Sequence, residues 1–329
     1  MTDMAERVAN LRRSVERQVR AAIGDKKVRA LVDFPNYPNV GDSAIYLGQL
    51  ACLRSLRIRR PRFICDFRTY DRKALAKAVR DGAILLTGGG SFGDLSPVAQ
   101  ECREDILRSF PNNRVIQLPQ SLHFQRTDSL DRAKRVIGSH RNLKLFWRDE
   151  RSLEMAKRNF DADSELCPDM AFCLGSLERP RPASTRIVWL LRTDKESAVT
   201  RPEDLKATIV DWRTEPGTRL LRLNYRLMGA TLRLPATRFW RSLLIQTYKP
   251  LATTRLRRGL NLLSGGDVVI TDRLHGHILS MLLGIPHVVL DNSYGKISSF
   301  HSAWTSGVEN VQYARSSKAA LELANALMK

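Results

Sequence analysis

A strand-like run passes directly into a helix-like run between residues 267 and 286. The run at 267–270 is apolar, and the helical run ends at Gly284-Ile-Pro286, where glycine and proline act as stop signals. Asp272, Arg273 and His275 therefore lie at a strand-to-helix junction. Open α/β sheets bind ligands at such junctions, and the free N–H groups of a helix N-terminus favour an anion. The segment predicts an anion site containing a histidine that can transfer a proton.

Strand-like and helix-like runs alternate along the rest of the chain, which is typical of parallel sheets built from βαβ units. Strands are expected at residues 29–34, 62–67, 83–87, 114–118, 143–147, 186–191, 267–270 and 287–290. Helices are expected at residues 42–56, 71–80, 97–109, 129–137, 150–159 and 317–328. The proline-rich residues 177–184 are expected to form a linker. We predict an α/β fold with two Rossmann-like domains facing a cleft, at residues 1–178 and 179–329.

The composition narrows the class of protein. Of the 329 residues, 43% are hydrophobic and 27% are charged, which is typical of a globular chain long enough for two domains. No apolar run reaches about 18 residues and the N-terminus is charged, so neither a membrane span nor a secretory signal is expected. We expect a cytoplasmic location. The five cysteines are scattered without metal-ligand spacing, which indicates reduced thiols and predicts no metal site.

The chain carries a formal charge of +20, and the excess is uneven. Residues 216–266 contain no Asp or Glu but ten Lys and Arg side chains, with Trp240, Phe239 and Tyr248 among them. This basic insert has two readings, a peripheral contact with an anionic membrane or a solvated basic face. Nucleic acid is not an expected partner, because aromatic residues make up only 7% and no nucleic-acid-binding module is recognisable.

A triple-glycine segment follows the third predicted strand. The backbone N–H groups of Gly88, Gly89 and Gly90 are expected to cradle an anion, because no side chain keeps a ligand away. The segment fits neither G-x-G-x-x-G nor a Walker loop, so a nicotinamide site is poorly supported. Asp94, at the end of the segment, is expected to point into the cleft as a base or to orient a hydroxyl.

Polar residues also follow other predicted strands. After the first strand, Gly41 would permit a tight turn and Asp42 or Ser43 would cap the next helix; an ordinary strand-to-helix connection explains this motif equally well. Gln120 and Ser121 follow the fourth strand and would face the same sheet edge.

The fifth strand leads into Arg148-Asp-Glu150, for which complementation of a helix dipole is a sufficient explanation. In the second half, Arg192 and Lys195 end a strand and are both suited to binding a phosphate or carboxylate. The histidines separate into two groups. His275 is the active candidate, whereas His277 points away on a helix and is expected to pack or cap, because two residues turn a helix by about 200°.

Taken in order, these motifs resemble the polysaccharide pyruvyl transferase family. The matching pieces are Asn39-Val-Gly-Asp42, Gly88-Gly-Gly90 with Asp94, Leu118-Pro-Gln-Ser121, Arg148-Asp-Glu150, Cys167-Pro-Asp169 and Asp272-Arg-Leu-His-Gly276. The resemblance implies a two-domain fold like that of GT-B glycosyltransferases, with the acceptor on the N-terminal side and the donor on the C-terminal side. It also implies that the donor is phosphoenolpyruvate, a co-substrate, and that no cofactor is required.

The resemblance further implies transfer of the enolpyruvyl group onto two hydroxyls of a sugar, forming a pyruvate ketal in an exopolysaccharide or cell-envelope glycan. We expect His275 and Asp94 to act as acid and base. Donor and acceptor binding is expected from Arg273, Leu274, Arg192, Gly88, Gly89, Gly90, Asn39, Asp42, Gln120 and Ser121.

Three further expectations concern partners and rival functions. The acceptor would be a sugar or a lipid-linked oligosaccharide, with residues 216–266 placing the protein peripherally on the inner membrane face. One alternative is a sugar-nucleotide-dependent glycosyltransferase of the same fold. The other is a basic protein that binds membrane or nucleic acid without catalysis.

Overall fold

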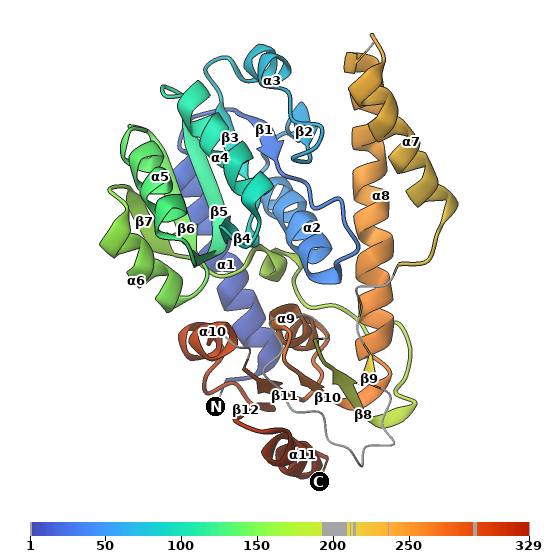
Figure 1. Cartoon of the computed structure of the whole chain (residues 1–329). Helices are drawn as coiled ribbons and strands as arrows, with labels where there is room; N and C mark the ends of the chain where they lie inside the picture. Colours follow the sequence, from blue (N-terminus) through green and yellow to red (C-terminus); the bar gives the residue numbers. More distant parts are fainter. Residues whose placement is uncertain are drawn as a thin grey trace.

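The computed structural model describes residues 2–192, 209–210, 212, 215–235, 237–291 and 295–328. They form two parallel β-sheets with helices packed around them (Figure 1). The first sheet has the order β2-β1-β3-β5-β6-β7, and β4 pairs only with β5; the second has the order β12-β11-β10-β8-β9. All pairings are parallel. The predicted α/β class with parallel sheets is confirmed.

The strands of the first sheet are β1 (Val28–Val32), β2 (Phe63–Cys65), β3 (Ala83–Leu86), β4 (Gly89–Gly93), β5 (Val115–His123), β6 (Leu143–Trp147) and β7 (Asp163–Leu166). Those of the second are β8 (Thr185–Leu190), β9 (Ile209–Val210), β10 (Gly266–Thr271), β11 (His287–Leu290) and β12 (Val311–Ala314). The helices of the first part are α1 (Met4–Ile23), α2 (Val40–Ser55), α3 (Arg72–Val79), α4 (Pro97–Ser109), α5 (Thr127–Gly138), α6 (Glu150–Asn159) and the 3-10 helix η1 (Met170–Leu174). Those of the second part are α7 (Arg219–Arg233), α8 (Thr237–Leu263), α9 (Leu274–Leu282), α10 (Lys296–Trp304) and α11 (Ser317–Ala326).

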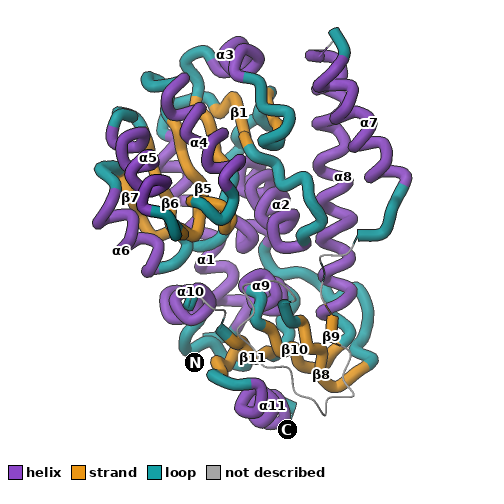
Figure 2. Tube along the Cα trace, in the orientation of Figure 1, coloured by secondary structure: helices purple, strands orange, loops and turns teal. Residues whose placement is uncertain are grey.

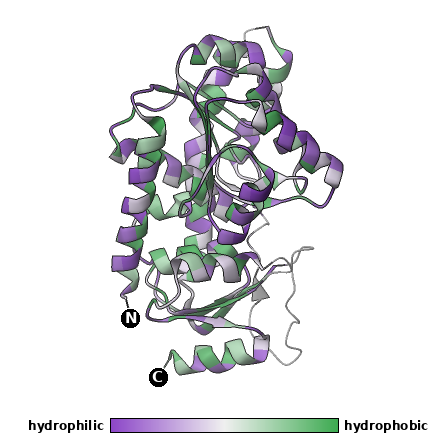
Figure 3. Ribbon diagram, turned by 90° about the vertical axis from the view of Figure 1, so that its left-hand side faces the viewer, coloured by the Kyte–Doolittle hydropathy of each residue, from purple (hydrophilic) through white to green (hydrophobic). Residues whose placement is uncertain are grey.

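Alternation along the strands builds a core on each face of the first sheet. In β1, Leu31 packs with α1 and α2, while Ala30 and Val32 face the opposite core with α3, α4, α5 and α6. The second sheet alternates likewise: Val269 belongs to the core shared with α9, and Ile270 packs toward α11. In Figure 3 the C-terminal helix α11 lies below the second sheet.

One hydrophobic core extends from the first sheet to the second. It contains side chains of α1, α2, η1, α8 and α9 together with strands of both sheets. Figure 2 shows α1 running from behind the first sheet down toward α9. At the N-terminal end of the chain, Thr2 forms an isolated parallel β-bridge with Val308. The chain leaves the first sheet after Leu166 and enters the second at Thr185. Because the core is continuous across this passage, a domain boundary at residue 178 stays a prediction.

Two local expectations are wrong. β5 continues to His123, so Gln120 and Ser121 lie inside a strand instead of following one. The segment Gly89–Gly93 is not an open loop but the short strand β4. In addition, the sequence analysis named no helix for α1, for α10 or for the basic insert, which folds as α7 and α8.

Polar caps fix several helix starts. Asp3 accepts hydrogen bonds from Ala5 N and Glu6 N at the start of α1, and Asp149 accepts one from Ser152 N at the start of α6. Such caps each stabilise a helix by about 1 kcal/mol. The five cysteines are buried and free. Within the described residues, no helix is both long and apolar enough to cross a membrane.

Candidate active site

The start of α9 is fixed by the strand that precedes it. Thr271, the last residue of β10, donates its hydroxyl to Leu190 O (2.8 Å) and accepts from Arg273 N (3.0 Å). A Cβ on Gly276 would lie 2.4 Å from the same hydroxyl, so only glycine allows the helix to approach the strand this closely. The glycine of the Arg-Leu-His-Gly motif therefore has a packing role.

Gly41 allows the two most distant motifs to meet. A Cβ on this residue would lie 2.4 Å from His275 Nδ1. Gly41 belongs to the first turn of α2 and has no positive φ, so the predicted tight turn is wrong. The residue is small so that the His275 ring can lie against the N-terminus of α2. The Asn-Val-Gly-Asp and Arg-Leu-His-Gly segments thus form one site.

His275 and Arg148 share a buried carboxylate. His275 Nε2 lies 3.5 Å from Asp169 Oδ2, at the limit of a hydrogen bond, and Arg148 Nη1 donates to the same oxygen at 2.7 Å. Burial alone would raise the pKa of Asp169, but His275, Arg148 and the donated Ala171 N–H lower it overall. Asp169 is therefore an anion that contacts the Arg148 guanidinium and the His275 ring.

Arg148 is held on several sides. Its Nε donates to Ser121 Oγ at 2.9 Å, and that hydroxyl donates to Asp149 Oδ2 at 2.7 Å. Trp304 Nε1 from α10 donates to Arg148 O at 2.8 Å. Ser121 is therefore a positioning residue for the guanidinium. The structure does not bear out its predicted contact with substrate, because Ser121 is buried and its hydroxyl is used internally.

The second and third glycines face charged side chains of both sheets. A Cβ on Gly90 would lie 3.0 Å from Lys296 Nζ, at the start of α10, and 3.1 Å from Arg148 Nη2. A Cβ on Gly89, whose φ is 137°, would lie 3.5 Å from Asp42 Oδ1. Together with His275, these contacts define a charged cluster around Gly89–Gly90. Lys296 belongs to none of the sequence motifs and could not be predicted from them, and no functional role was predicted for Arg148 or Asp169.

Gln120 shapes the glycine segment from behind. Its Nε2 donates to Thr87 O at 2.9 Å, and its Oε1 accepts from Ser91 N at 3.0 Å. The side chain is fully buried. Its predicted role as a substrate ligand is therefore replaced by a structural role in fixing the turn. Gly88 is also buried: a Cβ there would lie 2.7 Å from Pro119 O.

The N-terminus of α2 presents Asp42 to the glycines. Asn39 is the N-cap, since its side chain accepts from Gly41 N at 3.0 Å. The expected cap by Asp42 or Ser43 is wrong, and the substrate-binding role of Asn39 stays a prediction. Asp42 is left partly exposed beside Gly89. Burial and the neighbouring Asp42 raise the pKa of Tyr37, whose hydroxyl bonds to that carboxylate.

Asp94 lies away from the charged cluster. It is four residues beyond Gly90, about 13 Å along an extended strand. Its carboxylate accepts from Gln125 N at 2.8 Å and from Arg126 N at 2.7 Å, ahead of α5. The expected position facing a donor is not observed, because this carboxylate organises the connection between β5 and α5.

The remaining predicted residues flank α9. Asp272 Oδ1 accepts from Arg192 N at 2.8 Å, which places the end of β8 beside the α9 N-terminus. Burial raises the pKa of Asp272 to about 6, against the lowering effects of the Arg192 N–H and of both arginine charges. Arg273 is 5% exposed. Leu274 is also buried and belongs to the main core, so its predicted contact with a donor is replaced by packing. Lys195 lies outside the described residues.

His277, His287 and His301 form a largely buried chain behind the site. His287 Nδ1 lies 2.7 Å from Ile285 O, His277 Nδ1 lies 2.7 Å from His287 Nε2, and Thr305 Oγ1 lies 2.9 Å from both His277 Nε2 and His301 Nδ1. Burial lowers the pKa of all three rings. Since a carbonyl only accepts, His287 must donate to Ile285, so His277 donates to His287 and accepts from Thr305. This chain fixes the back of α9.

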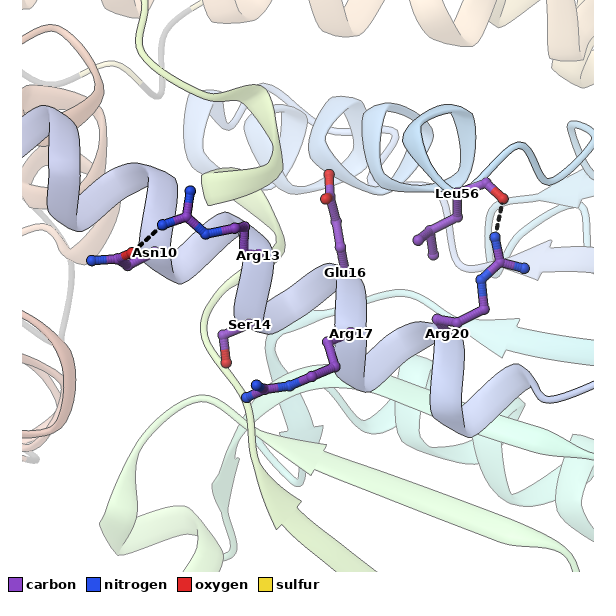
Figure 4. Close-up of a pocket in the computed structure, with 7 residues that line it drawn as sticks. All are labelled: Asn10, Arg13, Ser14, Glu16, Arg17, Arg20 and Leu56. Atoms are coloured by element: carbon purple, nitrogen blue, oxygen red, sulfur yellow. Dashed lines mark hydrogen bonds between the residues drawn. The ribbon is translucent and has the colours of Figure 1, made fainter.

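Two surface grooves lie elsewhere. One, of about 600 Å³, runs along α1 and is lined by Asn10, Arg13, Ser14, Glu16, Arg17, Arg20 and Leu56 (Figure 4). The other, of about 520 Å³, lies at the start of α8. Within the described ranges, no group of three His, Cys, Asp or Glu side chains is arranged to hold a metal ion.

The fold and the charged cluster define an α/β protein with two parallel sheets and a site where two cationic side chains, Arg148 and Lys296, meet beside Gly90. Comparison with known proteins identifies the family to which the chain belongs. Residues 39–294 match the family described as polysaccharide pyruvyl transferase, and the chain belongs to this family. The match begins at the Asn39 cap and extends past α9.

Two relatives support the assignment. The chain is 33% identical over 289 residues to "Putative pyruvyl transferase EpsO" of Bacillus subtilis (strain 168), covering 85% of this chain and 86% of that protein. It is also 33% identical over 300 residues to "Pyruvyl transferase 1" of Schizosaccharomyces pombe, covering 86% and 71%. A crystal structure of a functionally uncharacterized protein from Klebsiella pneumoniae has the same fold, with a TM-score of 0.62, 18% identity and coverage of 93% and 99%.

Proposed function

We propose that this protein transfers the enolpyruvyl group of phosphoenolpyruvate onto two hydroxyls of a glycan, forming a pyruvate ketal and releasing phosphate. The observation that supports it best is the cluster in which His275 and Arg148 share the Asp169 carboxylate beside Gly90 and Lys296. Four properties of the site fit the donor. Arg148 and Lys296 are cationic, the glycine segment lets a ligand reach the backbone, His275 is placed to donate a proton, and α9 presents its N-terminus. Phosphoenolpyruvate carries two anionic groups, and such groups bind strongly to paired cationic donors.

The donor would lie against the glycine turn. In this assignment, Arg148 and Lys296 bind its phosphate or carboxylate above Gly90, and the N-terminus of α9 with Arg273 and Arg192 binds the other anionic group. The cluster draws on both sheets, since Asp42, Gly90 and Arg148 follow strands of the first and His275 and Lys296 follow strands of the second. This supports a GT-B-like arrangement, with the acceptor on the N-terminal side and the donor on the C-terminal side.

The chemistry starts with proton transfer to carbon. His275 donates a proton to the vinyl methylene, which becomes a methyl group, and positive charge develops on the adjacent carbon. A sugar hydroxyl attacks that carbon and loses its proton to Asp42, which takes the base role first expected of Asp94. The C–O bond to phosphate then breaks, and the second hydroxyl closes the ring as its proton leaves with phosphate. Asp169, 3.5 Å from Nε2, would hold the His275 ring in position for this transfer.

The test is incubation with phosphoenolpyruvate and candidate glycans, measuring released inorganic phosphate and the ketal methyl group. His275→Asn should lower kcat by about 10²–10⁴ while donor affinity changes little, as is typical of lost general acid catalysis. Asp42→Asn should also lower kcat, whereas Asp94→Asn is the matched control and should leave it near that of the unaltered protein. Equal losses of affinity and rate in His275→Asn would reduce His275 to a ligand.

A thermal-shift comparison addresses the rival glycosyltransferase. Phosphoenolpyruvate should raise the melting temperature, because a ligand that binds only the folded state stabilises it, and nucleotide sugars should not. Stabilisation by a nucleotide sugar alone would overturn the donor assignment. No response to either ligand, with no phosphate release, would favour a protein without catalysis.

A further inference from the structure

The basic insert folds as a helical hairpin, α7 and α8, whose tip carries exposed apolar side chains. The hairpin runs along one side of the molecule (Figure 1). Seven large apolar side chains are exposed in the described part of the chain, and five of them belong to this hairpin. Leu232, Leu234 and Phe239 cluster around its tip, with exposed fractions of 56%, 43% and 57%. We define the tip as residues 232–239, without residue 236, which the structure does not describe.

The arginines of the hairpin divide into two sets. Arg241 bonds to Thr69 O and pairs with Asp71, while Arg255 forms a bidentate pair with Glu215; both arginines are buried. These two attach α8 to the rest of the protein. A third arginine, Arg258, is half-buried and donates to Trp212 O. The remaining basic side chains are exposed and consist of Arg219, Arg222, Arg226, Arg233, Arg238, Lys249 and Arg257. The sequence left open whether the insert is a solvated or a binding face, and the structure separates anchoring arginines from surface ones.

A second basic segment extends this surface. Residues 54–62, between α2 and β2, contain five exposed arginines, Arg54, Arg57, Arg59, Arg60 and Arg62, and no acid occurs between Asp42 and Asp66. Arg60 Nη2 donates to Ile245 O of α8 at 3.4 Å, so the segment lies against the hairpin. The sequence analysis did not single it out, because it contains no catalytic motif.

The segment also touches the groove on α1. Arg20 donates to Leu56 O, and the exposed Arg13 and Arg17 also line this groove (Figure 4). Glu16 is the acid lining this groove, and it already bonds to Arg12 at 2.9 Å. The cationic surface is therefore continuous from α1 through residues 54–62 to α8, where the apolar tip adjoins it.

We propose that this surface docks on an anionic phospholipid bilayer, with the tip entering the headgroup region. Exposed Arg attracts anionic headgroups, and apolar side chains beside it gain by leaving water. A nucleic acid would use the arginines but leave no role for Leu232, Leu234 and Phe239. A second copy of the chain is disfavoured, because two such faces would bring like charges together. The docking itself does not depend on the proposed reaction.

The test is co-flotation of the whole protein with phosphatidylcholine vesicles, with and without phosphatidylglycerol. Binding should require the anionic lipid. The triple variant Leu232→Ser, Leu234→Ser, Phe239→Ser should bind at least tenfold more weakly. Arg59→Gln, Arg60→Gln, Arg62→Gln should lose about 100-fold, at roughly fivefold per basic side chain. Leu95→Ser with Val98→Ser, which removes exposed apolar groups elsewhere, is the matched control and should bind like the unaltered protein.

Several outcomes would overturn the proposal. Equal binding to neutral and anionic vesicles would remove the role of charge, and unchanged binding of the tip variant would show that the tip stays outside the bilayer. Tighter binding to a single-stranded oligonucleotide than to anionic vesicles at the same salt would assign the surface to nucleic acid. A dimer in light scattering that is lost in the tip variant would assign it to a second copy. Phosphate release is measured separately, so failure of docking is distinguishable from failure of the proposed reaction.

Discussion

Replacing His287 with Gln should change how stability depends on pH. The ring is fully buried, and burial lowers its pKa from 6.5 to about 4. Between these two pH values the ring is protonated in the unfolded chain but not in the folded chain. The free energy of unfolding therefore falls as pH decreases. From about pH 7.5 to about pH 5, this one ring accounts for a loss of roughly 2 kcal/mol. Gln has no titratable group but can still accept from His277, so the variant should lack this part of the loss.

The assay is urea unfolding at both pH values for the unaltered protein, His287→Gln and Thr305→Val. Asp272 acts with the opposite sign, because its pKa is raised to about 6 and protonation of the folded state stabilises it as pH falls. It is present in every variant, so it cancels in the difference between them. Thr305→Val removes a buried hydroxyl without removing a titratable ring and should cost about 1–3 kcal/mol at both pH values. An unchanged pH dependence in His287→Gln would refute the reasoning.

Three substitutions probe the site through enzyme kinetics with phosphoenolpyruvate. Gly41→Ala places a methyl group 2.4 Å from His275 Nδ1 and should lower kcat/KM at least tenfold; Gly138→Ala, with open space around it, is the control and should have no such effect. Gly90→Ala places a methyl group 3.0 Å from Lys296 Nζ, so KM for the donor should rise more than kcat falls. Arg148→Lys cannot bond to both Ser121 and Asp169, and kcat/KM should fall by about 10²–10³. Near-normal kinetics in Gly41→Ala or Arg148→Lys would show that the His275 and Arg148 positions do not matter.

Sequence patterning predicted eight of the strands and several helices because each has a local signal, whereas β4, β7, β9 and β12 were not predicted. Alternating or continuous apolar runs marked β1, β3, β6 and β10, and the glycine and proline after α9 marked its end. The site was only partly predictable, because its geometry depends on contacts between distant segments. No local sequence signal near Gly41 predicts that the absence of a side chain there makes room for the His275 ring, 234 positions later. Gln120 and Ser121 were assigned to a ligand for the same reason, since their internal partners lie on other strands.

Asp169 shows why a buried acid is hard to recognise from the sequence and why it matters. In the sequence it is one carboxylate after a proline, without a partner at catalytic spacing. In the fold, η1 places it beneath α2 and α9, where it contacts Arg148 from the first sheet and His275 from the second. An acid on a surface would attract Arg148 weakly, because water screens exposed pairs. Loss of the Arg148 guanidinium from this buried site would leave the Asp169 charge unpaired in the interior, which is strongly destabilising. The site therefore depends on both sheets at once, and substituting Arg148 should also disturb the position of the His275 ring.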